Sequence, residues 1–330
     1  MYSRRSLALA NFKIDESNII EEFCGGNSTV LRCVTEDSPE FGLKIYLGSD
    51  SRQHQMIERE TQAIEFLTSM GFSNIPRNFV PDFELKIAKF DWFHGLSSPN
   101  DIDSLIELTS MAKNLYRATL SKAIFPTAID AVFELSDITF QIRDRLGKIG
   151  KLDKSFNTQC VIENIESRLR YLHSKLPTLT EFGVITLSLS DMGTHNLIRS
   201  KPMSHQFIDF EFFGVDSLTK LMADFWLHPR NYFSDSETFS FQESLKTFTG
   251  WNDEELRLTL PFFALKWATI AYTRELRESD ADTLARGITQ PRASKGDGYL
   301  HYFDNILKLG GESKFSTFNN FLVENGHEVE

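Results

Sequence analysis

The chain has 330 residues and carries 35 basic and 46 acidic side chains, a formal net charge of −11. A chain of this length can bury its own core without disulfides or a structural metal, and 41% hydrophobic with 25% charged residues is typical of a globular protein. Neither half of the chain is basic, which argues against a nucleic-acid partner. No apolar stretch is long enough for a membrane-spanning helix. Three cysteines without a CxxC pair suit a reducing compartment, so we expect a cytoplasmic protein.

Upstream of residue 93 the pattern predicts a β-rich domain. Short apolar runs separated by clusters of turn-forming residues are typical of strands. They cover Asn18–Cys24, Thr29–Val34, Phe41–Leu47 and Phe79–Phe90. One helix, Arg52–Met70, interrupts them and ends at Gly71. We therefore expect a five-stranded sheet with one helix over residues 1–93.

Residues 94–330 read as a second, mainly helical domain. The predicted helices are Ile102–Thr119, Ala128–Leu146, Val161–Leu176, Leu218–His228, Glu254–Leu276 and Tyr299–Leu309. Two apolar, strand-like runs, Val184–Ser190 and His205–Phe212, interrupt these helices. The sequence thus predicts the α+β class, with a small β-rich part before a large helical part.

Two misplaced charges stand out in the first domain. Helical spacing places Glu60 on the apolar face of its helix with Ile57 and Ile64, and Lys44 interrupts an apolar strand. Two opposite charges in such places can satisfy each other. The alternative is that Glu60 reaches solvent from the edge of its stripe and Lys44 lies on an exposed strand face.

Acidic and amide residues gather around the two strand-like runs of the second domain. Asp191 and Asn196 lie in the loop between the runs, and Asp209 lies in the second run. Phosphoryl transfer needs a carboxylate near the attacking hydroxyl and oxygen ligands for Mg²⁺. Each of these residues alone would more often be a turn or capping residue, but three of them beside apolar strands favour a phosphoryl-transfer site.

A turn made of four small residues connects the first two predicted strands, and it contains Gly25, Gly26, Asn27 and Ser28. Backbone N–H groups in such a turn can approach a phosphate, although a plain hairpin has the same composition. The chain has no Walker A, GxGxxG, HExxH or GxSxG motif, so the enzyme classes that these motifs mark lose their usual support.

The order of these parts resembles the aminoglycoside phosphotransferase and choline kinase group, which has a protein-kinase-like fold. A glycine-rich turn is followed by a strand lysine, a helix glutamate, the motif DxxxxN and the motif Asp-Phe-Glu. The strongest stretches are Ser190–Asn196 and Ile208–Asp216, continuing through Lys220 to Ala223–Pro229. They are similar to a bacterial subset of the group that is often encoded with surface-polysaccharide genes.

The resemblance implies a role for each motif residue. Asp191 would be the catalytic carboxylate that orients or deprotonates the acceptor hydroxyl, and Asn196 and Asp209 would ligate Mg²⁺. Lys44 would contact the α and β phosphates and be held by Glu60.

The turn residues Gly25 to Ser28 would cover the phosphates, according to the same resemblance. The segment Ala88–Trp92, including Phe90, Asp91 and Trp92, would offer its backbone to the adenine. Asp224 would brace the catalytic loop as a structural residue.

Taken together, the resemblance implies a two-lobed, Mg²⁺-dependent kinase that uses ATP or GTP to phosphorylate a hydroxyl of a small acceptor, and the expected acceptor is a sugar or sugar-like compound. By analogy the acceptor would lie near the C-terminal helices, where Lys266 and Arg274 are weak candidates for contacting an anionic sugar. The chain departs from the group at Leu189, where many members have His, and its glycine turn is short. An alternative is therefore a catalytically weak or inactive nucleotide-binding protein with a kinase fold.

Overall fold

The computed structural model describes residues 4–36, 38–121, 124–175, 181–200, 204–286, 294–308 and 316–324. These residues pack as two compact units, one bounded by Met1–Pro99 and Thr194–Gly214 and the other by Asn100–Gly193 and Val215–Glu330. The segment Thr194–Gly214, which the sequence analysis placed in the second domain, packs with the earlier sheet. Whether residues 93 and 94 separate two independently folding domains stays a prediction.

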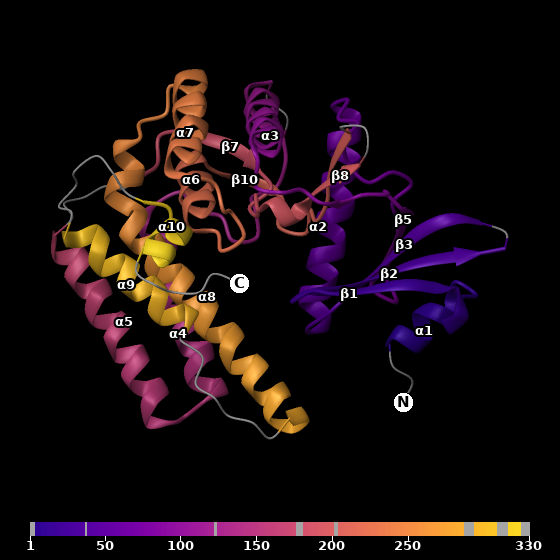
Figure 1. Ribbon diagram of the computed structural model, residues 1–330, viewed down its shortest axis with the longest axis horizontal. Coiled ribbons are helices and arrows are strands. Elements are labelled where there is room, and N and C mark those ends of the chain that lie inside the picture. The colour runs from indigo at the N-terminus through magenta and orange to yellow at the C-terminus, as the bar shows by residue number, and fades with distance from the viewer. Residues whose placement is uncertain are drawn as a thin grey trace. The chain divides into compact units, whose positions relative to one another are not determined.

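The first unit is built on a five-stranded antiparallel sheet (Figure 1). Its order is β1-β2-β3-β5-β4, and its strands are β1 (Ile19–Cys24), β2 (Ser28–Thr35), β3 (Ser38–Tyr46), β4 (Val80–Asp82) and β5 (Ile87–Asp91). The predicted strand Phe79–Phe90 is in fact two strands with a turn between them. The other predicted strands agree with β1, β2 and β3 to within a few residues.

The two faces of this sheet have different partners. Leu31, Leu43 and Ile87 pack on one face against Leu9 and Ile14, which lie in and just after helix α1 (Arg4–Asn11). Tyr46 and Ala88 pack on the other face against Met56 and Ile57 of helix α2 (Asp50–Ser69). Alternation along a strand therefore places Lys44, which is two residues from Tyr46, on the α2 face.

A second, three-stranded sheet completes the first unit. Its order is β6-β8-β9, and its strands are β6 (Leu96–Ser97), β8 (Leu197–Ser200) and β9 (Ser204–Phe207). The N–H of Phe207 donates to the carbonyl of Asn74, which ties β9 to the segment after α2. The predicted strand His205–Phe212 ends early, because Asp209 has a φ of 67° and a turn closes from Phe213 N–H to Phe210 O.

The second unit is mainly helical. Its helices are α3 (Ile102–Leu120), α4 (Leu135–Leu152), α5 (Phe156–Lys175), α6 (Leu218–Leu227), α7 (Asp235–Thr249), α8 (Glu254–Arg286), α9 (Lys295–Lys308) and α10 (Phe318–Glu324). The strands β7 (Ile185–Ser188) and β10 (Gly214–Ser217) pair with each other, and α8 and α9 lie side by side (Figure 1). These observations confirm the α+β class, with a β-rich earlier part and a large helical later part.

Several helices differ from the sequence-based expectation: α1 and α10 were not predicted, and α8 continues past Leu276 to Arg286. Two further differences have a visible local reason. The predicted helix Ala128–Leu146 begins later, at Leu135, because the preceding residues make non-helical bonds; the N–H of Val132, for example, donates to the Asp216 carboxylate. Helix α7 was not predicted, although Ser234 and Glu237 form its capping box and Gly250 ends it in a left-handed conformation. Leu176 and Leu309, which ended two predicted helices, lie outside the described residues.

None of the helices in the described ranges is both long enough and apolar enough to cross a membrane.

Candidate active site

In the first unit, Lys44 is the centre of a buried cluster of charges. Its Nζ lies 2.7 Å from Glu60 Oε2 and 2.7 Å from Asp209 Oδ1. Burial alone would lower the pKa of Lys44, but the charges of Asp209, Glu60 and Glu211 outweigh burial and raise it well above its usual range. The Lys44–Glu60 pair expected from the sequence is therefore confirmed, and the exposed-face alternative is wrong.

Glu60 is fixed by more than Lys44. The hydroxyl of Tyr46 donates to Glu60 Oε2 at 2.7 Å, and the backbone N–H of Phe210 donates to Oε1 at 3.3 Å. Glu60 is 2% exposed, so these bonds replace the water that its carboxylate loses. The strand, the helix and the Asp-Phe-Glu motif thus meet at one carboxylate. Tyr46 had not been identified from the sequence.

Glu211 is a third carboxylate of this cluster, and its contacts were not anticipated. It is 1% exposed, its Oε1 accepts a 2.8 Å hydrogen bond from Asn27 Nδ2, and its Oε2 lies 3.5 Å from Lys44 Nζ. Burial, together with the charge of Asp209, raises the pKa of Glu211 to about 7. The available signal was its position two residues after Asp209 in an apolar run.

The donors of this cluster suit a divalent cation. Glu60, Asp209 and Glu211 offer carboxylate oxygens that lie within 4.8 Å of one another. Three carboxylates outnumber the single ammonium of Lys44, and Glu211 Oε2 accepts no hydrogen bond among the residues described. Hard cations such as Mg²⁺ prefer oxygen ligands and offset such a negative excess. The residues present in the first unit therefore fit Mg²⁺.

Asn196, the other residue expected at the metal, lies in the same unit as Asp209. It ends the short 3-10 helix Thr194–Asn196 and is 4% exposed, and its carbonyl accepts the N–H of Ile208, one residue before Asp209. This backbone bond joins the DxxxxN and Asp-Phe-Glu motifs. The ligand roles of Asn196 and Asp209 stay predictions.

The glycine turn forms a tight hairpin. The N–H of Gly25 donates to the carbonyl of Ser28, and the N–H of Leu47 donates to the carbonyl of Asn27. The side chain of Asn27 points toward Glu211, with which it forms the hydrogen bond described above. Gly26 has no heavy atom near its missing Cβ position, so the turn leaves room above it. That Gly25, Gly26, Asn27 and Ser28 cover phosphates stays a prediction.

The proposed adenine segment continues the pairing of β5 with β3. The N–H of Asp91 donates to the carbonyl of Arg77, and that of Trp92 donates to the carbonyl of Glu40. The ring of Phe90 lies against Gly42, where an added Cβ would come within 2.3 Å of the ring. Since the N–H groups of residues 91 and 92 are used within the unit, adenine recognition there would fall to carbonyl groups or to the residues that follow.

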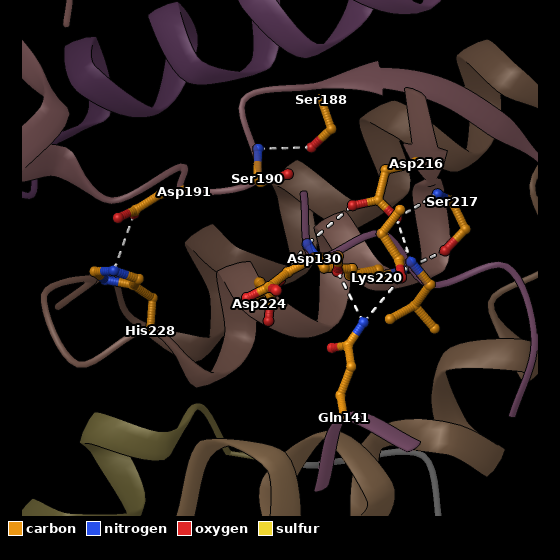
Figure 2. Close-up of polar contacts among 12 residues, drawn as sticks. Asp130, Gln141, Ser188, Ser190, Asp191, Asp216, Ser217, Lys220, Asp224 and His228 are labelled. Carbon is orange, nitrogen blue, oxygen red and sulfur yellow. Dashed lines mark hydrogen bonds and ion pairs between the residues drawn. The ribbon is translucent and has the colours of Figure 1, made fainter. Parts of the chain in front are cut away.

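In the second unit, Asp191 lies in the loop after β7, and Figure 2 shows its contact with His228. Asp191 Oδ1 lies 3.1 Å from His228 Nε2 and also accepts the N–H of Gly193 at 3.3 Å. Its side chain is 36% exposed, so the carboxylate is held but remains accessible. The residue before it, Ser190, has a φ of 61°, which is uncommon for a residue other than glycine.

Strain of this kind marks the two loops that carry the candidate carboxylates. Asp209 has a φ of 67° and lies in the first unit, whereas Ser190 precedes Asp191 in the second. Such conformations persist only where the surroundings enforce them, and they are frequent at functional sites.

Asp224 belongs to a buried network of charges in the second unit, part of which Figure 2 shows. Lys220 Nζ lies 2.9 Å from Asp216 Oδ2 and 3.0 Å from Asp224 Oδ2. Asp224 Oδ1 also accepts a 2.9 Å bond from the indole N–H of Trp267. Asp224 is thus held by a lysine and a tryptophan, an arrangement compatible with the structural role expected for it. Lys220 and Asp216 were not anticipated, although their spacing of four residues was a signal.

The two weak acceptor-site candidates lie on α8 in different environments. Lys266 is 3% exposed, and burial lowers its pKa to about 8. Arg274 is exposed. That Lys266 and Arg274 contact an acceptor stays a prediction.

Comparison with solved structures decides the fold. The chain is similar to choline kinase LicA from Streptococcus pneumoniae, with 14% identity, a TM-score of 0.57 and coverage of 88% of this chain and 94% of that one. It is similar to a choline kinase from Cryptosporidium parvum Iowa II, with 13% identity, a TM-score of 0.60 and coverage of 94% and 95%. It is also similar to ADP-bound aminoglycoside phosphotransferase APH(2'')-Ib, with 16% identity, a TM-score of 0.51 and coverage of 84% and 95%.

The chain has the fold of choline kinases and aminoglycoside phosphotransferases. No protein-family model matches its sequence, and no curated protein does. At 13–16% identity the likeness establishes the kinase-like fold that the motifs implied, whereas substrate and activity have to be argued from the chain's own residues.

Proposed function

We propose that this chain is a Mg²⁺-dependent small-molecule kinase that transfers the γ-phosphate of ATP or GTP to a hydroxyl group of a sugar or sugar-like acceptor. The observation that carries the proposal is the position of Lys44, with Nζ 2.7 Å from both Glu60 and Asp209. A lysine held by a helix glutamate and facing the Asp-Phe-Glu carboxylate is suited to grip nucleotide phosphates.

The first unit would bind the nucleotide. Lys44 would exchange part of its contact with Asp209 for phosphate oxygens while Glu60 keeps it oriented. Asp209 and Asn196 would hold Mg²⁺, which neutralises charge that develops on the phosphates. The solved relatives include an aminoglycoside phosphotransferase with ADP and a LicA complex with AMP, which supports a nucleotide co-substrate.

The second unit would act on the acceptor. Asp191 would accept a hydrogen bond from the acceptor hydroxyl, orient it and take its proton as the new O–P bond forms. Asp191 is partly exposed and is held by two donors, so it can perform this role without first breaking a buried contact.

The test is turnover of Mg·ATP and Mg·GTP with a panel of sugars, sugar phosphates, choline, ethanolamine and aminoglycosides. We expect transfer to at least one acceptor, and Asp191→Ala should abolish it while leaving the dissociation constant of Mg·ATP nearly unchanged. Asp209→Ala should instead weaken binding of the Mg²⁺ complex. A wild-type protein that neither binds Mg·nucleotide nor turns it over would refute the proposal.

Thermal unfolding with and without Mg·nucleotide, combined with the turnover assay, distinguishes an active kinase from a protein that binds nucleotide without catalysis. A protein that is stabilised by Mg·nucleotide but shows no turnover would be a nucleotide-binding protein with a kinase fold. Transfer to choline or an aminoglycoside but to no sugar would keep the kinase and overturn the sugar acceptor.

A further inference from the structure

The carboxylate of Asp191 is held by a histidine side chain that lies just after helix α6. His228 Nε2 lies 3.1 Å from Asp191 Oδ1, and both residues belong to the second unit (Figure 2). The N–H of Gly193 donates to the same oxygen at 3.3 Å. Two donors on one oxygen restrict rotation of the carboxylate, which a single hydrogen bond would leave freer.

The tautomer of His228 can be assigned from its second nitrogen. The backbone N–H of Arg230 donates to His228 Nδ1 at 3.1 Å. In a neutral imidazole one nitrogen donates and the other accepts, so the ring hydrogen belongs on Nε2, facing Asp191. The backbone after α6 therefore fixes the direction in which His228 donates.

The ring itself is also fixed. His228 packs edge-on against Trp267, with ring centroids 5.4 Å apart and an interplanar angle of 84°. Trp267 in turn donates its indole N–H to Asp224 and stacks on Tyr299. His228 is 7% exposed, so it has little room to rotate away.

We propose that His228 is a positioning residue for Asp191. It donates its Nε2 hydrogen to Oδ1 and so presents the carboxylate to the acceptor hydroxyl in one orientation, without touching the acceptor. The inference rests on the proposed function, since positioning is useful only where Asp191 receives a proton from an acceptor.

The contact of His228 with Asp191 also connects Trp267 and Asp224 to the catalytic loop. Asp224 holds the indole, the indole holds the imidazole edge, and the imidazole holds Asp191. The structural role expected for Asp224 thus reaches the catalytic loop through two aromatic side chains rather than by direct contact.

The kinetic test compares His228→Ala and His228→Gln with the wild type. A misplaced catalytic group costs about 100-fold in rate, so we expect His228→Ala to lower kcat by about that factor while the KM for Mg·ATP changes little. The amide N–H of His228→Gln can reach the same oxygen and should restore a substantial part of kcat. If acceptors in the panel fail, Mg·ATP hydrolysis by water serves as the assay.

His173 provides a matched control in the same unit. It also bonds through Nε2, to Thr139 Oγ1 at 3.0 Å, and packs edge-on against an aromatic ring, Phe262, at 5.4 Å. His173→Ala should leave kcat unchanged. An equal fall in both alanine variants, or an active wild type with an unaffected His228→Ala, would overturn the inference and leave the proposed function standing.

A measurement without turnover tests the contact itself. Side-chain ¹⁵N NMR at pH 8 should show the Nε2–H tautomer for His228, and Asp191→Asn should shift the Nε2 resonance. The Nδ1–H tautomer, or no response to Asp191→Asn, would refute the inference even if the wild type has no activity. If His228 has the Nε2–H tautomer but the wild type shows no turnover at all, the result counts against the proposed function and therefore against the positioning role.

Discussion

Each unit buries a lysine among carboxylates, but the two clusters are built differently. Lys44 lies on a strand, and its partners come from α2 and from the distant Asp-Phe-Glu motif. Lys220 lies on α6, and Asp216 and Asp224 lie four residues before and after it. The first cluster joins separate parts of its unit, whereas the second is closed within one stretch of chain.

The exposure of the carboxylates separates the two clusters further. The side chain of Asp209 is 35% exposed, whereas those of Asp216 and Asp224 are 0% and 11% exposed. A partly exposed carboxylate can change partners at modest cost, but a closed buried triad cannot. We infer that Lys44 belongs to an exchangeable site and that Lys220 is structural.

The largest expected effect is on the closed cluster. Lys220→Met should lower the free energy of unfolding by about 3–5 kcal/mol, because it leaves two buried carboxylates without a cation. Urea denaturation measures the loss. Asp216→Asn combined with Lys220→Met should recover part of it. Full stability in Lys220→Met would show that the cluster is not a structural element.

A third buried lysine, Lys266, tests the cost of burial where burial outweighs the charge of the nearby carboxylate of Asp224. Its pKa is lowered by burial to about 8 from 10.5 in the unfolded chain, and no ion pair holds it among the described residues. The buried charge therefore costs stability at neutral pH, so Lys266→Met should stabilise the protein by up to about 3 kcal/mol.

Because the pKa of Lys266 is lower in the folded chain than in the unfolded chain, its effect on stability changes over a defined pH range. Between about pH 8 and 10.5 the unfolded chain binds more protons at this site, so wild-type stability rises with pH there. The advantage of Lys266→Met should be full below pH 8 and vanish near pH 10.5. Urea denaturation across pH measures it, with Lys151→Met, at an exposed lysine of the second unit, as the control. An advantage that does not depend on pH would indicate a packing effect instead.

Lys44→Met should cost less stability than Lys220→Met, about 1–2 kcal/mol, because Glu60 keeps two other donors and Asp209 is partly hydrated. The effect that distinguishes Lys44→Met from Lys220→Met should be on the binding of Mg·ATP. The thermal stabilisation by Mg·ATP should disappear in Lys44→Met and persist in those Lys220 variants that fold. An unchanged nucleotide shift in Lys44→Met would contradict an exchangeable site.

The smallest expected effect concerns the link between the glycine turn and Glu211. Asn27→Ala removes the 2.8 Å bond to Glu211 Oε1 and should cost about 1 kcal/mol of stability or less, since Asn27 is only partly buried. Asn27→Asp should cost more, because it places a second negative charge beside Glu211. Equal effects of the two substitutions would argue against the contact.

The features that could be predicted from the sequence were those that depend on the periodic placing of apolar residues. Glu60 and Lys44 were identified because each is a charge on an apolar face, and the structure pairs them. The β-rich and helical parts follow from the same patterns. The Lys220 cluster could have been predicted from its spacing, but three charges at intervals of four residues usually indicate the solvated face of a helix.

The contacts that the sequence did not predict join residues far apart in the chain. Asn27 and Glu211 meet through side chains from a hairpin and from the later Asp-Phe-Glu motif, and no local pattern encodes that contact. The contact of His228 with Asp191 depends on where α6 ends and on the packing of Trp267. Positive φ at Asp209 shortened a predicted strand because tertiary contacts outweighed an apolar run.

Gly42 on β3 and Phe90 on β5 face each other across the sheet, and the ring of Phe90 lies so close to Gly42 that the residue at one position restricts the other. A Cβ at position 42 would come within 2.3 Å of the ring, so any residue other than glycine there requires the ring of Phe90 to move. Phe90 is only partly buried, so Phe90→Ala would open the surface beside the strand that carries Lys44 rather than leave a closed void. Position 42 should then accept alanine, which the natural chain can accommodate only by moving the ring.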